Sequence, residues 1–540
     1  MAQEQGANSS RSCSMCCPAM VSKCWSSRAS HDSAFVRVST PRGTFVGVQD
    51  AGLNIFRGVP YAKCRRLCPP EQIENYEERI YDKPGPICPQ GHLYSVSGAL
   101  KFLREHRGEV PKVLPVNMSE EECLNMQIYI PASADRDNLC PVVVFLHGGI
   151  MTYGANQEAF YQDDWGCKLA VDQQIAVVLP NYRLGPFGFL KVPGHLGNMG
   201  IRDVIAMLQW VRDLGPHFGL NPHAVTLSGQ SGGAMVVGNL LRAPSAQGLF
   251  NRIIMISGSP QYCFKSVETA EVVGQALVSL VDIKESTSLE LLDAALQLVP
   301  DYGHICFQPC MDKDILMPGY CSSGIEVLTG ICENEALLFV PSFHSMAMEP
   351  VERIFGAVMG KGQLNVNMSE AERDDIIDTV QRDYGVELPV DIFRRLYSCV
   401  FMEAPLQQTL LDLMHTNKIY VYRNCFHDSH CSEVGYIFGT WGSTRVNRFL
   451  SGLSPIFLTR HCIDKAHAEE KIWGSIIRSF VLQGCPSPGW PLCDQQLLGV
   501  KLSPELRLSG GALPVVPIFA EAVGKIRALM ARSSWPYGVK

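Results

Sequence analysis

The stretch TLSGQSGGA, residues 226–234, places Ser231 between two glycines, Gly229 and Gly233, directly after an apolar run. The preceding AVTLS is typical of a buried strand, and the following AMVVGNLLRA is typical of a helix. A glycine-rich turn alone would explain the small residues. A strand, tight turn and helix of this form also hold a nucleophilic serine on a strained elbow, with the helix N-terminus pointing N–H groups at any anion formed there. The second interpretation requires partners elsewhere in the sequence.

The composition limits the class of protein. The chain has 540 residues, 46% hydrophobic and 18% charged, which are ordinary values for a protein that buries a large core. Its formal net charge of −7 and the absence of a basic block argue against a nucleic-acid partner. No apolar run approaches the roughly 20 residues that a membrane-spanning helix requires. The 21 cysteines are an odd number, so at least one is unpaired within the chain.

The N-terminal segment differs from the rest of the sequence. Residues 1–33 are polar and rich in Ser and Cys, without the continuous apolar segment of a signal peptide, and we expect them to be disordered. No internal repeat or long low-complexity linker follows, so we expect residues 34–540 to form a single domain.

Strand and helix patterns alternate along this domain. Residues 34–63 alternate apolar and polar side chains between glycines, which predicts short antiparallel strands. Buried strands are predicted in segments 140–149, 175–185, 223–233 and 251–260, and amphipathic helices in segments 200–219, 369–385, 466–484 and 519–534. Strands alternating with helices predict an α/β fold with a central, mostly parallel twisted sheet flanked by helices, plus a small N-terminal antiparallel sheet. Its site should lie at the carboxyl ends of the strands.

Several longer motifs stand in a fixed order along the chain. They are FRGVPYAK (56–63), CPQ (88–90), HGG (147–149), NYRLGPFGFL (181–190), GNMGIRD (197–203), GQSGGA (229–234) and GYIFG (435–439). In these blocks the chain resembles the type-B carboxylesterase family, which also includes cholinesterases and juvenile-hormone esterases. The resemblance covers roughly residues 34–500, and NYRLGPFGFL is its most specific motif. It implies the α/β-hydrolase fold and hydrolysis of carboxylic esters without a metal or an organic cofactor.

The resemblance also implies a Ser–Glu–His triad. Ser231 is the nucleophile, and GICENEALLF (330–339) matches the block of the family's acid with Glu335 in register. Counting back from the GYIFG motif identifies His430 as the base. Glu333 and His427 are the alternatives, and the register of the two blocks favours Glu335 and His430.

The implied oxyanion hole departs from the family pattern. Its backbone donors fall at Gly148, Gly149, Ile150 and Gly232, where Ile150 replaces the family's third glycine in HGGG. The donor is an N–H group, so a side chain does not remove it, but a β-branched residue restricts the backbone and crowds the acyl side of the site. The loss of one such donor costs about 3–4 kcal/mol of transition-state stabilisation. Ile150 is therefore the feature that favours an alternative function, a weak or inactive relative that serves as a binding or adhesion protein.

Two further departures bear on the substrate. Gln230 replaces the glutamate common before the nucleophile, which removes an attraction for cationic substrates. No Trp lies between Cys88 and Cys123, so the cation–π platform for choline is missing. We therefore expect small-molecule substrates that are neutral, fairly lipophilic carboxylic esters.

The resemblance implies a disulfide between Cys88 and Cys123 if the compartment is oxidising. Asn117 and Asn367 lie in N-M-S sequons, which matter only on the secretory route. The family implies a secreted or ER-lumenal protein, whereas the lack of a visible signal peptide leaves a cytoplasmic esterase as the alternative. In the motif CRRLCPP (64–70), shorter than its family counterpart, Cys64 and Cys68 have no partners in the family pattern.

Overall fold

A computed structural model of the chain describes residues 34–90, 117–158, 168–262, 264–303, 305–338, 368–430, 432–438, 460–503, 506, 508 and 513–532. The N-terminal segment 1–33 that we expect to be disordered lies outside these residues.

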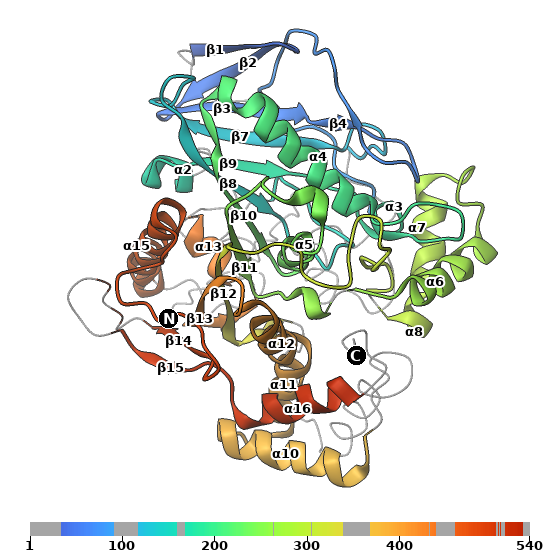
Figure 1. The fold of residues 1–540 in the computed structure, drawn as a ribbon, viewed down its shortest axis with the longest axis vertical. Helices are drawn as coiled ribbons and strands as arrows, with labels where there is room; N and C mark the ends of the chain where they lie inside the picture. The colour runs from blue at the N-terminus through green and yellow to red at the C-terminus, as the bar shows by residue number, and fades with distance from the viewer. Residues whose placement is uncertain are drawn as a thin grey trace, which may run out of the picture.

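The centre of the molecule is a 13-stranded sheet with the order β1-β2-β3-β7-β9-β8-β10-β11-β12-β13-β14-β15, in which β6 pairs with β2 (Figure 1). From β9 to β14 every neighbouring pair is parallel. The strands of this part are β9 (Ala176–Pro180), β8 (Cys140–Leu146), β10 (Leu220–Gln230), β11 (Arg252–Ile256), β12 (Glu326–Asn334), β13 (Lys418–Ser429) and β14 (Leu498–Leu502). The mostly parallel central sheet is therefore confirmed.

Antiparallel strands extend this sheet at both edges. On the N-terminal side they are β1 (Ala34–Thr40), β2 (Gly43–Asp50), β3 (Leu53–Pro60) and β7 (Asn125–Pro131), with β6 (Arg79–Ile80) parallel to β2. At the other edge β15 (Val515–Pro517) pairs with β14. A separate small antiparallel sheet is formed by β4 (Ala62–Lys63) and β5 (Glu71–Gln72).

Each central strand sends alternate side chains to two different cores. On β8, Val142 and Val144 belong to one hydrophobic cluster, whereas Val143 and Phe145 belong to the other. The first core includes side chains of α4 (Met199–Leu214), α5 (Gly232–Leu240) and α12 (Ala404–Leu413), and the second includes those of α2 (Lys168–Gln173), α13 (Ser432–Ile437) and α15 (Arg460–Gln483). The helices therefore cover both faces of the sheet, as Figure 1 shows.

The helices expected from the sequence are present with shifted ends. The segment 369–385 forms α10 (Glu370–Tyr384), and a capping box between Ser369 and Glu372 starts it. The C-terminal stripe is α16 (Glu521–Arg532), whose Val523, Ile526 and Met530 are buried against the first core. The other α-helices among the described residues are α3 (Gly185–Phe189), α6 (Val267–Leu280), α7 (Ser288–Gln297), α8 (Val299–Tyr302) and α11 (Pro389–Ser398). Within the described residues, no helix is both long and apolar enough to cross a bilayer.

Candidate active site

Ser231 occupies the single residue between the end of β10 and the start of α5. Its φ of 53° and ψ of −120° lie outside the regions that non-glycine residues ordinarily adopt. A Cβ on Gly229 would come within 2.5 Å of the Gly233 carbonyl carbon, and one on Gly233 within 2.2 Å of the Leu146 oxygen. The flanking glycines are therefore required by close packing, and they hold the serine on a strained turn.

The loop after β8 turns back against this elbow. Gly149 has a φ of 103°, and Ile150 a φ of 49°. A Cβ on Gly232 would lie 2.8 Å from the Ile150 nitrogen, so the Ile150 amide is next to the first residue of α5. A Cβ on Gly148 would lie 2.3 Å from Gln230 Oε1 and 3.1 Å from the Gln230 carbonyl oxygen, so Gly148 packs closely against the residue before Ser231. The structure thus brings the four residues of the expected oxyanion hole next to the elbow.

His147 packs under the loop that follows β8 and stabilises it. Its ring stacks on Tyr182 with 4.7 Å between ring centroids, and the Tyr182 hydroxyl donates to the His147 carbonyl oxygen at 3.0 Å. Burial lowers the pKa of His147 to about 4. The imidazole is therefore neutral at pH 7, and Nδ1 can donate to the Gly148 carbonyl oxygen at 2.9 Å.

Glu335 and His430 meet where two adjacent parallel strands end. Glu335 follows β12 directly, and His430 follows β13. Both side chains are buried, and Nδ1 of His430 lies 2.5 Å from Oε2 of Glu335. Because Nδ1 donates to the carboxylate, Nε2 is the acceptor of the ring. The Gln230 amide nitrogen lies 3.1 Å from Nε2, so this acceptor edge faces the elbow.

The alternative acid, Glu333, has a different environment. Its carboxylate lies 3.5 Å from Arg423 and 3.6 Å from Arg395. Burial would raise the pKa of Glu333, but the charges of the two arginines outweigh it and hold the pKa below its usual value. Glu333 thus belongs to an ion-pair network. The side chain of His427, the alternative base, lies outside the described residues.

A second buried acid lies behind Glu335. The Ser257 hydroxyl, which follows β11, is 2.7 Å from Oε1 of Glu335 and 2.9 Å from Oε1 of Glu433. A hydroxyl carries one proton, so it can donate to only one of these carboxyl groups. Burial, and then the negative charge of Glu335, raise the pKa of Glu433 to about 7. A protonated Glu433 that donates to Ser257, which in turn donates to Glu335, satisfies both contacts.

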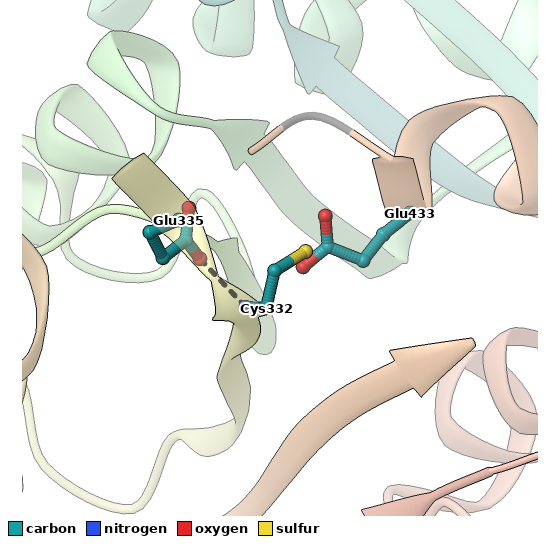
Figure 2. A group of neighbouring side chains, drawn as sticks. All are labelled: Cys332, Glu335 and Glu433. Atoms are coloured by element: carbon teal, nitrogen blue, oxygen red, sulfur yellow. Dashed lines mark hydrogen bonds between the residues drawn. The ribbon is translucent and has the colours of Figure 1, made fainter. Parts of the chain in front are cut away.

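Cys332 completes this cluster (Figure 2). Its backbone N–H donates to Oε1 of Glu335 at 2.6 Å, and its thiol is 3.2 Å from the Ser432 hydroxyl. The donor atoms of Cys332, Glu335 and Glu433 lie within 4.8 Å of one another, and by type they could hold a metal ion. In the structure both oxygens of Glu335 instead accept hydrogen bonds from the chain.

Ser257, Cys332 and Glu433 were not among the residues predicted from the sequence. The signal for Glu433 was its position three residues after His430 in HCSE. Ser257 had no signal, because its contact depends on the lateral order of β11, β12 and β13 in the sheet.

A buried ion pair joins two of the family-like motifs. Arg183 of NYRLGPFGFL and Asp203 of GNMGIRD form two side-chain contacts, Nε to Oδ2 at 2.8 Å and Nη2 to Oδ1 at 2.6 Å. Nη1 of Arg183 also donates to the carbonyl oxygens of Arg65 and Cys68. The pair therefore connects the loop between β9 and α3 to α4 and to the loop after β4.

The remaining predicted residues are two cysteines and two sequon asparagines. Cys88 and Cys123 are buried free thiols, and their disulfide stays a prediction. Asn117 is exposed, whereas Asn367 lies outside the described residues.

A serine on an elbow at the carboxyl end of a parallel strand, with a His–Glu pair at the ends of two strands further across the sheet, defines the α/β-hydrolase class. Solved structures agree in fold. A thermophilic pNB esterase superposes with a TM-score of 0.71 at 25% identity, covering 92% of this chain and 99% of its own. The Geobacillus stearothermophilus carboxylesterase EST55 gives a TM-score of 0.71 at 23% identity, with the same coverage.

The chain belongs to the Carboxylesterase family, whose model matches residues 32–451, and it is accordingly a carboxylic ester hydrolase. It is 32% identical to the para-nitrobenzyl esterase of Bacillus subtilis over 60% of this chain and 68% of that protein. It is also 32% identical to human cocaine esterase over 55% of each chain. Carboxylesterase 1C of Rattus norvegicus is 25% identical over 86% of this chain and 89% of its own.

Proposed function

We propose that Ser231, His430 and Glu335 form a catalytic triad that hydrolyses neutral, lipophilic carboxylic esters through an acyl-serine intermediate. The observation that carries this proposal is the 2.5 Å contact between His430 Nδ1 and Glu335 Oε2, made with the opposite ring nitrogen facing the elbow. This contact selects the tautomer in which Nε2 can accept the serine proton.

The reaction would proceed in two halves. Ser231 Oγ attacks the ester carbonyl carbon while its proton passes to His430 Nε2, and collapse of the tetrahedral intermediate releases the alcohol with that proton. Water, deprotonated by the same nitrogen, then attacks the acyl-serine and releases the carboxylic acid. Glu335 stabilises the imidazolium in both halves.

The negative charge that develops on the carbonyl oxygen would be held by backbone N–H groups. Those of Gly148, Gly149, Ile150 and Gly232 are the proposed donors, supported by the close approach of Ile150 to Gly232. The uncharged side chain of Gln230 beside His430 favours neutral substrates, because it adds no anionic site for a cationic group. The names of the relatives range from para-nitrobenzyl esterase to pyrethroid hydrolase, so the particular ester is left open.

A fluorophosphonate probe tests the nucleophile. We expect the wild type to be labelled only on the peptide that contains Ser231. Ser231→Ala should lose both the labelling and the turnover of a para-nitrophenyl ester. Ser228→Ala, three residues earlier on β10, is the matched control and should keep both. A wild type that stays unlabelled at saturating probe contradicts the proposal.

One observation favours a second candidate, a binding protein with little or no hydrolysis. Ile150 holds a left-handed backbone conformation at the proposed oxyanion hole, which is unfavourable for a β-branched residue. A folded protein that binds neutral esters but neither turns them over nor reacts with the probe would support this second function.

We also propose that the protein enters the secretory route. The exposed Asn117 in an N-M-S sequon supports this assignment, as does the pairing of Cys88 and Cys123 that the family pattern implies.

A further inference from the structure

Three cysteines share one buried site on the N-terminal side of the sheet. Cys64, Cys88 and Cys123 are 3%, 1% and 0% exposed, and all three are free thiols. The Cys88 thiol lies 4.0 Å from the Cys123 carbonyl oxygen, and both Cys64 and Cys88 are close enough to the Cys123 thiol to shift its pKa. Cys64 and Cys123 also point at the same acceptor, the Glu120 carbonyl oxygen, at 2.9 and 3.8 Å. Cys123 therefore lies between two possible partners.

Two hydrogen bonds that involve no thiol fix this convergence. The Tyr61 N–H donates to the Leu124 carbonyl oxygen at 3.0 Å, which brings the chain before Cys64 against the residue after Cys123. The Asn125 side-chain amide donates to the Pro86 carbonyl oxygen at 2.7 Å, which brings the chain before Cys88 to the same place. The three segments thus meet through contacts that do not depend on the thiols.

We propose that Cys123 has two alternative disulfide partners, Cys88 and Cys64, and that the Cys64–Cys123 bond is a second oxidised form that excludes the first. With glutathione disulfide as the oxidant, the Cys123 thiolate attacks one glutathione sulfur and releases one glutathione thiolate. The Cys64 or Cys88 thiolate then attacks the Cys123 sulfur of this mixed disulfide and releases the second. Two protein thiols are oxidised, and one glutathione disulfide is reduced to two thiols.

Whether Cys123 bonds to Cys64 or to Cys88 is determined during folding, before the three thiols are buried. The hydrogen bond with Cys123 and burial both raise the pKa of the Cys64 thiol, and burial raises that of Cys88, so thiolates are scarce in the folded protein. Exchange in the native state is therefore slow, and each molecule keeps the bond that it formed during folding.

The two bonds differ in what they hold in place. Gln90, two residues after Cys88, accepts from the Gly154 N–H at 2.9 Å and donates to the Gly154 carbonyl oxygen at 3.0 Å. Gly154 closes the loop that carries Ile150, and a Cβ on it would lie 2.4 Å from Nδ1 of His147. The Cys88–Cys123 bond therefore anchors the segment that carries Gln90, which holds Gly154 at the end of the proposed oxyanion loop. The Cys64–Cys123 bond leaves that segment without a covalent anchor. We expect several-fold lower ester turnover in the second form, an expectation that rests on the proposed function.

Refolding followed by peptide mapping tests the pairing. The reduced, denatured full chain is refolded over a range of glutathione to glutathione-disulfide ratios, free thiols are blocked with N-ethylmaleimide, and the protein is digested with trypsin without reduction. Cleavage after Lys63, Arg65 and Arg66 separates Cys64 from Cys68, so the two are distinguished by mass. We expect both cross-linked forms of the Cys123 peptide in the wild type.

Cysteine variants test each of the two disulfides separately. Cys88→Ser should give only the Cys64–Cys123 bond, and Cys64→Ser only the Cys88–Cys123 bond. Cys140→Ser is the matched control. The Cys140 thiol is buried and lies 3.4 Å from the Pro141 and Gln174 carbonyl oxygens, so its substitution should leave the ratio of the two forms unchanged. A wild-type digest in which Cys64 is blocked by N-ethylmaleimide at every glutathione ratio overturns the proposal, whether or not the variants fold.

The activity arm is separate from the mapping. Turnover of each oxidised form is divided by the fraction of Ser231 that the fluorophosphonate probe labels. Equal turnover of the two forms overturns the tether to the oxyanion loop. Failure of the probe to label either form counts instead against the proposed function, and leaves the mapped disulfides as they are.

Discussion

At the scale of single residues, substitution of Ile150 tests the proposed oxyanion hole. A left-handed conformation costs an L-residue roughly 1–2 kcal/mol, and glycine adopts it freely. We therefore expect Ile150→Gly to raise kcat for a short-chain aryl ester several-fold without loss of the fold. Ile150→Val, which keeps the branch at Cβ, should stay near the wild-type rate. A glycine variant that is unchanged or slower would mean that Ile150 already presents its N–H well and shapes the acyl side of the site.

A second prediction at this scale concerns Glu433 and the pH dependence of the free energy of unfolding. Its pKa is near 4.3 in an unfolded chain and about 7 in the folded protein. Between these values the folded state binds more protons than the unfolded state, so the free energy of unfolding falls as the pH rises through this window. Glu433→Gln removes the titration and keeps a hydrogen-bond donor for Ser257.

Urea unfolding at pH 5, 6, 7 and 8 measures this effect. The wild type should lose stability relative to Glu433→Gln as the pH rises, with most of the change complete shortly above pH 7. Glu370→Gln, at the exposed start of α10, is the control and should follow the wild-type pH dependence. A difference that grows in favour of the wild type at high pH would contradict a raised pKa.

At the scale of secondary-structure elements, the ion pair between Arg183 and Asp203 holds the loop between β9 and α3 against α4. Removing one partner of a buried pair leaves an uncompensated charge, so Asp203→Asn should lower the free energy of unfolding by about 3–5 kcal/mol. The matched control is the exposed pair of Arg382 and Glu521, 60% and 59% exposed, where Glu521→Gln should cost no more than about 1 kcal/mol. Equal losses in chemical denaturation would show that Arg183 finds another partner.

The sequence predicted most elements of the sheet and the elbow, because alternation of apolar residues and the small residues around Ser231 are local signals. The motif registers predicted which Glu and which His would approach each other, and the structure brings Glu335 and His430 into contact. The sequence could not predict that Glu333 faces Arg423 and Arg395, since that contact depends on which strands and helices are neighbours. The same holds for Ser257, 78 residues before the carboxylate that it contacts.

At the scale of the whole molecule, the proposed secretory route predicts a glycan on Asn117. Its side chain is exposed, so an oligosaccharide can be attached without disturbing the core. Expression in the secretory pathway of a eukaryotic cell should give a band that shifts on treatment with peptide N-glycosidase F, and Asn117→Gln should remove that part of the shift. Asn221→Gln, in a sequence without a sequon, should leave it unchanged. An unmodified Asn117 in secreted material would contradict the assignment.

The alternation of side chains along the central strands has a consequence for how the protein unfolds. Because Val142 and Val144 serve one core and Val143 and Phe145 the other, the same backbone hydrogen bonds support both. Loss of the helices on one face would expose apolar side chains on every central strand, and would weaken the sheet on which the opposite layer packs. The two layers should therefore unfold cooperatively, and slowly exchanging amide protons should cluster on β8, β10 and β11.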